Sequence, residues 1–410
     1  MPLGTAYTFG CRAENPSPRH RPSFKKFQGL ETRRCFTTMP LILIGSFYMK
    51  AILLSLAVAS LLSGCTTAKT ERIYIGTGKG GGIYFTDLDT GTGRLSPPVK
   101  ASDTRGAGFI TVSPDNRFLY ATGVASFKIN ENGTLTQLSE QQSGEKGSCY
   151  VSTDHTGQML MTAYYSSGSV ASFKISDGTL SEAISIHRHT GSGQHPNRQK
   201  KPFGHSVVPN PENTHAYVAD LGIDKIMIYS MNPEEGTLSP AGEAVVPGGA
   251  MGPRHMKFSP DGKRLYVLNE LDLSVSTFRT LANGRLNFLS TTPMLPENAD
   301  KTDLTAAEIR IHPNGKFIFT SLRDGSDRRR DSIITYRIIS DGLQRIQTTP
   351  AQVWVPRNFN IDSSGKCLIV GGQLSKDIVT FRIDPKTAAL TFTDSRIPLE
   401  SEPICFEFTH

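Results

Sequence analysis

The stretch that decides the fold reads HMKFSPDGKRLYVLNE and spans residues 255–270. Apolar and polar residues alternate at its start, the triplet Pro-Asp-Gly follows at 260–262, and a second alternating run completes it. A period of two is typical of half-buried antiparallel strands. Proline fixes φ at the first corner of a turn, and glycine tolerates the positive φ that such turns often require. The stretch therefore predicts two adjacent strands joined by a tight turn.

Five other stretches repeat this arrangement. They are FITVSPDNRFLYATG at 109–123, YVSTDHTGQMLMTAY at 150–164, HSVVPNPENTHAYVAD at 205–220, IRIHPNGKFIFTSL at 309–322 and NFNIDSSGKCLIVGG at 358–372. A third alternating strand and a fourth short element follow them, as in SVSTFRT and the segment behind GRL. Each unit is thus a four-stranded antiparallel sheet of about 50 residues, and repeats of this kind are typical of β-propeller blades.

The number of blades is seven when one blade is divided between the two ends of the repeat region. Residues 71–96 carry the later strands of a blade, and residues 403–408 alternate like an opening strand with no partner after them. Pairing of these segments would close the ring and remove exposed sheet edges, which invite aggregation. We predict an all-β protein, a seven-bladed β-propeller of four-stranded antiparallel blades over residues 71–410, closed by its C-terminal strand.

The segment before the repeats has the pattern of an export signal. Residues 49–65 combine a lysine, an apolar run and a small-residue ending at a cysteine, as in a secretory signal peptide. The last four, Leu62-Ser63-Gly64-Cys65, resemble the bacterial lipobox. This resemblance implies a periplasmic protein anchored to a membrane through lipid on Cys65, with residues 66–70 as a tether. Because a signal peptide should begin the chain, we interpret residues 1–48 as an extension upstream of a start at Met49.

The basic net charge of +7 comes mostly from this extension. Residues 1–48 hold seven lysines and arginines against two glutamates, which accounts for +5. The rest of the chain is nearly neutral, so its charge does not predict nucleic-acid binding. Of the cysteines after Cys65, namely Cys149, Cys367 and Cys405, none forms a CxxC pair typical of a zinc site. We expect small buried side chains at all three, although Cys367 and Cys405 would lie on neighbouring blades, where an oxidising compartment would allow a disulfide.

Several of the repeats resemble a known family. The phrases are IYIGTGKGGGIYFTDLDTGTGRL, HSVVPNPENTHAYVADLGIDKI, GPRHMKFSPDGKRLYVLNEL and PRNFNIDSSGKCLIVGGQLSKDIVTFRID. They resemble the seven-bladed lactonase family, which includes bacterial propeller-type 6-phosphogluconolactonases and fungal carboxymuconate-lactonizing enzymes. The likeness extends over about residues 71–410. It implies hydrolysis of a lactone at the mouth of the central channel, and we expect no cofactor.

The resemblance also implies site residues, and lactone chemistry explains their types. Opening a lactone needs a base that activates water, groups that stabilise the oxyanion, and a proton for the leaving hydroxyl. The residues at the matching positions are His205, Arg254, Glu270 and Arg323. We expect His205 to act as general acid and base, with Glu270 as its carboxylate partner or as an alternative base. The arginines would hold the substrate anion and the oxyanion, and Arg357 and His255 are further candidates for substrate binding.

Each catalytic candidate also has a purely structural interpretation. His205 could be a hydrogen-bonded structural histidine, and Arg254 and Glu270 could form a plain cross-strand salt bridge. Arg323 could belong to the charged loop at 327–331.

Three positions also depart from the family pattern. Phe203 and Cys149 stand where histidines are common, and the loop after residue 123 lacks the usual Asn-Glu phrase.

The sequence leaves three functions open. The first is a lactonase acting on a sugar-derived or carboxylated lactone. The second is a non-catalytic, membrane-tethered propeller that binds a protein or glycan, and the third is a muconate-type cycloisomerase. No helix follows the glycine-rich segment at 76–82, so it does not predict a nucleotide site, and His187, His189 and His195 would give at most a weak metal site in a loop. We expect a monomer that binds a small lactone or sugar acid, without metal or nucleic acid.

Overall fold

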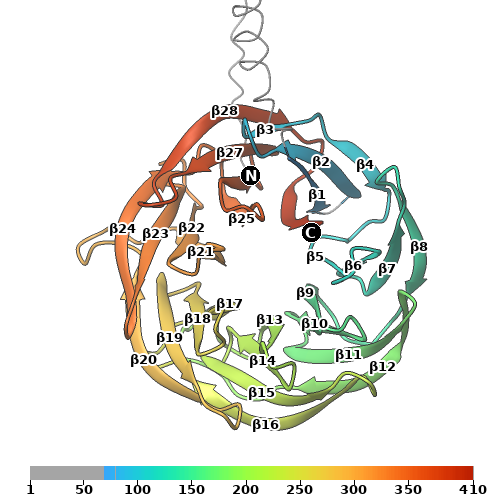
Figure 1. The fold of residues 1–410 in the computed structure, drawn as a ribbon. Helices are drawn as coiled ribbons and strands as arrows, with labels where there is room; N and C mark the ends of the chain where they lie inside the picture. The colour runs from blue at the N-terminus through green and yellow to red at the C-terminus, as the bar shows by residue number, and fades with distance from the viewer. Residues whose placement is uncertain (1–68, 79, 410) are drawn as a thin grey trace, which may run out of the picture. The chain divides into compact units, whose positions relative to one another are not determined.

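The computed structural model describes residues 69–78 and 80–409. Within these residues every regular element is a β-strand, and the strands form seven antiparallel sheets arranged as blades around a centre (Figure 1). Six sheets have four strands and the seventh has five. The predicted seven-bladed β-propeller is therefore confirmed.

Each blade runs from an innermost strand to an outermost one. The innermost strands are β5 (Ile110–Val112), β9 (Ser148–Thr153), β13 (Gly204–Pro209), β17 (Pro253–Phe258), β21 (Leu304–Ile311), β25 (Pro356–Ile361) and β29 (Pro403–Phe408). The second strands are β6 (Phe118–Ala121), β10 (Met159–Tyr164), β14 (His215–Asp220), β18 (Arg264–Asn269), β22 (Phe317–Asp324), β26 (Cys367–Gly372) and β1 (Thr70–Thr77). The third strands are β7 (Ala125–Ile129), β11 (Ser169–Ser176), β15 (Lys225–Asn232), β19 (Ser274–Thr280), β23 (Ser332–Ile339), β27 (Asp377–Ile383) and β2 (Ile83–Asp89). The outer strands are β8 (Leu135–Glu140), β12 (Thr179–Arg188), β16 (Thr237–Val245), β20 (Leu286–Pro293), β24 (Gly342–Pro350) and β28 (Leu390–Pro398), and in the five-stranded blade β3 (Arg94–Leu95) and β4 (Val99–Ser102) both pair with β2.

The ring closes through the two ends of the repeat region, as predicted. β29 pairs antiparallel with β1, with Ile75 opposite Phe406 and Gly76 opposite Cys405, so the last strand of the chain is the innermost strand of the first blade. The predicted signal at 49–65, the lipidation site Cys65 and the extension at 1–48 lie outside the described residues. Among the described residues, none forms a helix of the length and apolarity needed to span a membrane.

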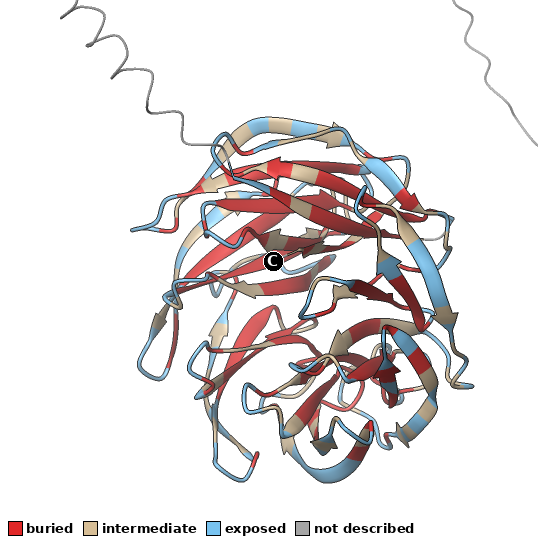
Figure 2. Cartoon of the chain, turned by 45° about the vertical axis from the view of Figure 1, so that its right-hand side comes forward, coloured by how far each residue is buried: buried red, intermediate tan, exposed pale blue. Residues whose placement is uncertain are grey.

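Burial falls from the middle of each blade to its outer edge (Figure 2). β10 and β26 are buried at every position, whereas β16 exposes most of its residues. Both faces of a middle strand are covered by the adjoining blades, while an outer strand meets water. This explains why the second strand of each repeat has a nearly continuous apolar run in the sequence.

Buried tyrosines join neighbouring blades. The hydroxyl of Tyr74 on β1 donates to the carbonyl of Gly133 (2.9 Å), and that of Tyr217 on β14 donates to the carbonyl of Gly284 (2.6 Å). Both glycines have positive φ in the outer turn of the next blade, and each tyrosine satisfies a polar group that the packing would otherwise bury unpaired. These two hydrogen bonds link neighbouring blades.

The cysteines of the described region are free thiols. Cys367 and Cys405 are fully buried, Cys149 is partly buried, and none of them forms a disulfide. The expectation of buried side chains is thus confirmed for Cys367 and Cys405.

Candidate functional site

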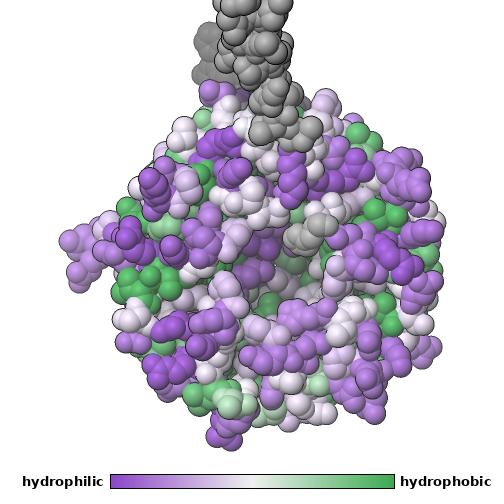
Figure 3. Space-filling model, in the orientation of Figure 1, coloured by the Kyte–Doolittle hydropathy of each residue, from purple (hydrophilic) through white to green (hydrophobic). Residues whose placement is uncertain are grey.

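The candidate site is a cavity of about 540 Å³ at one end of the central channel. Successive blades run their innermost strands in the same direction, so the starts of those strands meet at one mouth. His205 on β13, Arg254 on β17 and Arg357 on β25 line the cavity from such strand starts. Figure 3 shows one face of the ring, hollowed at its centre. The channel therefore gathers side chains from several blades.

Glu270, directly after β18, contacts three arginines in this cavity. Its Oε2 accepts from Nε of Arg254 at 2.8 Å and lies 3.3 Å from Nη2 of Arg323. Its Oε1 accepts from Nη2 of Arg198 at 2.6 Å. One carboxylate thus holds three guanidinium groups that reach it from three different blades or loops.

The three arginines keep the carboxylate of Glu270 ionised. Burial alone would raise the pKa of Glu270, but the charges of Arg323, Arg254 and Arg198 outweigh it and lower the pKa to about 2. The carboxylate is ionised throughout the neutral range and is a weak proton acceptor. The structure therefore favours Glu270 as the group that positions the arginines over Glu270 as a base.

His205 has the opposite character. Its ring is buried, and burial together with the positive charges of Arg254 and Arg357 holds its pKa well below the usual 6.5. The ring packs edge-on against Tyr165 on one side and His255 on the other, with ring centroids 5.4 Å apart in both pairs. Its Nδ1 has no hydrogen-bond partner among the described residues. The lowered pKa makes His205 a weak base, as it does Glu270, but Nδ1 of His205 has no partner in the described part of the chain, whereas both carboxylate oxygens of Glu270 are held by arginines.

The arginines of the cavity outnumber its carboxylates. The residues that line it include four arginines, at 198, 254, 323 and 357, and a single carboxylate, Glu270. Arg357 makes no side-chain hydrogen bond or ion pair with any described residue, and Nε of Arg323 is buried without a partner. Burial and mutual repulsion lower the pKa of Arg323 to about 9 and that of Arg357 to about 10. These unpaired donors can bind an anion.

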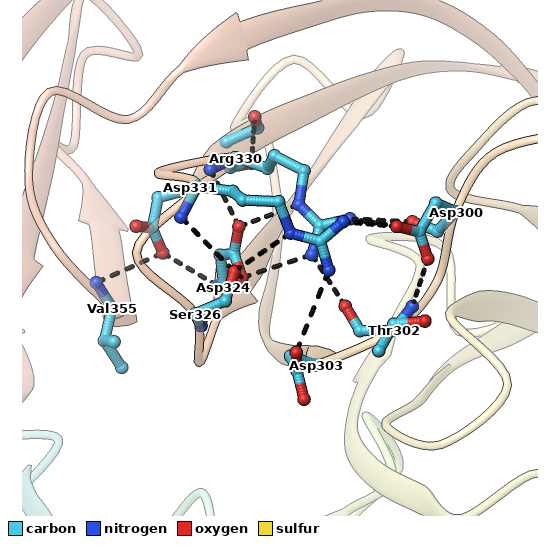
Figure 4. Close-up of polar contacts among 10 residues, drawn as sticks. Asp300, Thr302, Asp303, Asp324, Ser326, Arg330, Asp331 and Val355 are labelled. Atoms are coloured by element: carbon cyan, nitrogen blue, oxygen red, sulfur yellow. Dashed lines mark hydrogen bonds and ion pairs between the residues drawn. The ribbon is translucent and has the colours of Figure 1, made fainter.

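Arg323 does not belong to the charged loop that follows it. Figure 4 shows that loop, in which Nε of Arg330 donates to Oδ2 of Asp324 at 2.8 Å and Nη2 donates to the carbonyl of Thr302 at 2.6 Å. The next residue, Asp331, accepts from the amides of Asp324 and Val355. These contacts stay within the loop and its neighbours, while Arg323 lies in the cavity and donates to the carbonyl of Ala306.

His255 lies behind the cavity rather than in its lining. Its Nε2 is 3.2 Å from Nη1 of Arg254, and its Nδ1 is 3.2 Å from Oε1 of the buried Glu308. Burial lowers the pKa of His255 to about 3, because the attraction of Glu308 only partly offsets the desolvation. Of the six predicted site residues, the structure thus places five around one cavity and His255 in the wall behind them.

Arg198 is a cavity residue that the sequence did not indicate. It lies in the segment between β12 and β13, which the sequence predicts to be a loop. The neighbouring Gln199 anchors this segment, because its Nε2 donates to the carbonyl of Leu221 and to Oδ1 of Asp224. A lone arginine in a polar stretch gives no sequence signal, so only the fold could identify it.

The histidines of the same segment serve structural roles. His189 is buried between Oδ2 of Asp220 (2.6 Å) and the hydroxyl of Tyr229 (3.0 Å), and His187 contacts the carbonyl of Leu238. In the part of the chain that the structure describes, no three potential ligand residues gather as a metal site.

Two of the departures from the family pattern have a packing explanation. Phe203 stacks on Tyr165 with ring centroids 4.6 Å apart and so supports the ring that contacts His205. Cys149 lines the cavity with its thiol near the carbonyls of Gly204 and His205, and burial raises its pKa to about 12. The thiol is therefore not a nucleophile at neutral pH.

Residues 62–408 match the family described as "Lactonase, 7-bladed beta-propeller". The chain belongs to this family. The 6-phosphogluconolactonase of Bacillus subtilis (strain 168) is 31% identical over 353 residues, which cover 82% of this chain and 98% of that protein. The 6-phosphogluconolactonase of Formosa agariphila is also 31% identical, over 76% of this chain and 91% of that protein. Among solved structures, the periplasmic gluconolactonase of Pseudomonas aeruginosa is similar to this lactonase-family chain with a TM-score of 0.77 and 26% identity, over 83% of this chain and 99% of that one.

Proposed function

We propose that the protein hydrolyses a sugar-derived or carboxylated lactone at the cavity around His205. The observation that supports this most is the pairing of a neutral, buried imidazole with unpaired arginine donors in one cavity. A lactonase needs both a proton acceptor for water and cationic groups for a developing oxyanion. The two relatives named 6-phosphogluconolactonase support the substrate class.

The residues suggest how the reaction would run. His205 takes a proton from water as the water oxygen bonds to the lactone carbonyl carbon, and the carbonyl electrons move onto oxygen. Arg323 and Arg254 stabilise that oxyanion. When the carbonyl re-forms, the ring C–O bond breaks and His205 returns the proton to the leaving alkoxide, giving the hydroxy acid. Arg357, which has no partner among the described residues, binds the substrate's carboxylate or phosphate.

We also propose that the protein is exported and held at a membrane by lipid on Cys65. The pattern at 49–65 supports this, and a structural neighbour is a periplasmic gluconolactonase. An exported enzyme would meet unphosphorylated aldonolactones, so gluconolactone is a sensible first substrate. Labelled palmitate should enter the wild-type protein in a bacterial host and not the Cys65→Ala variant, and equal labelling of both would refute the anchor.

The assay of the proposed activity is acid release from gluconolactone and 6-phosphogluconolactone, measured by pH-stat above the spontaneous rate. His205→Gln should lower kcat by about a hundredfold or more, as expected for loss of a general base. His215→Gln is the control, because His215 lies on β14 away from the cavity and should retain activity. No acceleration of either lactone by the wild-type protein, or full activity in His205→Gln, would contradict the proposal.

A further inference from the structure

A second cavity, of about 520 Å³, lies at the opposite ends of the innermost strands. It is lined by the last residues of β9, β13 and β17, whereas the candidate site is lined by the first residues of β13, β17 and β25. Its walls include Phe109, Tyr150, Val208, Met256 and Phe258, and its charged side chains are Lys257, Arg310 and Glu407. The two cavities share no lining residue.

Lys257 is the unusual group in this cavity. Its ammonium makes no hydrogen bond and no ion pair within 4 Å with any residue that the structure describes. Burial and the nearby charge of Arg310 lower its pKa to about 8, and the carboxylates of Glu308 and Glu407 and the thiol of Cys405 act in the opposite direction. Lys257 is half-buried and lines the cavity, so its ammonium, unpaired among the described residues, is a cation that an anionic ligand can reach.

The neighbouring charges already have partners. Nη2 of Arg310 lies 3.5 Å from Oε1 of Glu407 and 3.8 Å from Oε2 of Glu308, and its Nε donates to the carbonyl of Phe359 at 3.2 Å. Glu308 also accepts from Asn358. Arg310 thus engages both carboxylates, which leaves the single ammonium of Lys257 free to pair with one carboxylate of a ligand.

The apolar wall indicates the rest of the ligand. The rings of Phe109 and Tyr150 stack with centroids 4.2 Å apart beside the cavity, and Met256 and Phe258 flank Lys257 in the sequence of β17. Ligand pockets of this kind bury an apolar body and fix its orientation with a few polar groups.

We propose that this cavity is a binding site for a small monocarboxylate with an apolar body, whose carboxylate pairs with Lys257. The site is separate from the candidate lactonase cavity, because the buried ring of His255 lies between them, 5.1 Å from Tyr150 and 5.4 Å from His205. The proposal does not rest on the proposed lactonase activity.

Isothermal titration calorimetry at pH 6.5 tests this site with benzoate and its neutral analogue benzamide. Benzoate should bind the wild-type protein about tenfold or more tightly than benzamide, and Lys257→Met should remove this difference. Lys316→Met, which removes an exposed lysine outside both cavities, should leave benzoate binding unchanged. Benzoate affinity that is kept in Lys257→Met, or lost equally in Lys316→Met, would overturn the proposal, and so would the absence of saturable binding to the wild-type protein.

A second measurement needs no variant. Because Lys257 loses its proton as the pH rises through about 8, benzoate affinity of the wild-type protein should fall between pH 7 and pH 9. An affinity that stays constant over this range would place the ligand on an arginine and refute the assignment to Lys257.

Discussion

Replacement of Glu270 by glutamine should destabilise the protein by about 3 kcal/mol at pH 7. The fall of the Glu270 pKa from 4.5 in the unfolded chain to about 2 in the folded one corresponds to about 3 kcal/mol of interaction with the ionised carboxylate. The removal of one partner from a buried ion pair typically costs about 3–5 kcal/mol, because the remaining charge stays buried. Glu270 is 5% exposed, so solvent screening does little to reduce this figure.

The pH dependence of this loss is characteristic. A carboxylate whose pKa is lowered by folding stabilises the protein fully above pH 4.5, and this stabilisation disappears as the pH falls through about 2. The wild-type protein should therefore lose about 2 kcal/mol more than Glu270→Gln between pH 7 and pH 3.

Urea unfolding followed by the fluorescence of Trp354, the single tryptophan, measures both free energies. Glu243→Gln is the control, because its ion pair with Lys225 is exposed and such pairs contribute about 0–1 kcal/mol. A Glu270→Gln protein as stable as the wild type at pH 7, or a difference that does not shrink at pH 3, would refute the role of Glu270 as the anchor of the arginines.

Three further predictions concern the site and the ring. Arg357→Met should raise KM for 6-phosphogluconolactone by about tenfold or more and change that for gluconolactone less, since the substrate anion loses a charged partner; equal effects on both would contradict anion binding. Because the pKa of His205 is well below 6.5, activity should not fall with a midpoint near 6.5 as the pH drops from 8 to 6, and such a midpoint in a pH–rate profile would show a normal histidine. Deletion of residues 403–410 removes the innermost strand of the first blade and exposes the edge of β1. The variant should therefore be insoluble or lack a cooperative unfolding transition in calorimetry. A soluble variant with normal unfolding would show that β29 does not close the ring.

The fold was predictable because its information is local and repeated. Alternation along each strand and the Pro-Asp-Gly type of turn specify a hairpin within about fifteen residues, and six copies leave little choice of architecture. The closure by 403–408 followed from the missing opening strand of the first blade. By contrast, the tyrosine hydrogen bonds between blades depend on which turn lies opposite each hydroxyl. No pattern in a single sequence predicts which tyrosine meets which turn.

The site was predictable only where the family likeness marked it. His205, Arg254 and Glu270 occupy strand ends that the repeats align, so their gathering at one mouth follows from the fold. Arg198 contacts the carboxylate of Glu270 from a loop whose course depends on the hydrogen bonds of Gln199. The strand periodicity of the sequence does not predict such a loop contact. The arginines that lower the pKa of Glu270 likewise come from several parts of the ring. The sequence therefore could not decide whether Glu270 acts as a base or as the carboxylate partner of His205.

The position of His255 shows how one strand can serve two cavities. Within β17, Arg254 and Lys257 reach opposite ends of the channel, and His255 lies between them with both ring nitrogens engaged by Arg254 and Glu308. Glu308 in turn lies beside Arg310, so a continuous row of polar contacts crosses the centre of the ring. A buried imidazole with two partners has no lone nitrogen to offer a substrate, whereas His205, one blade away, keeps Nδ1 unpaired. The difference in hydrogen bonding, rather than in burial or in distance from the arginines, is what makes His205 the better candidate for proton transfer.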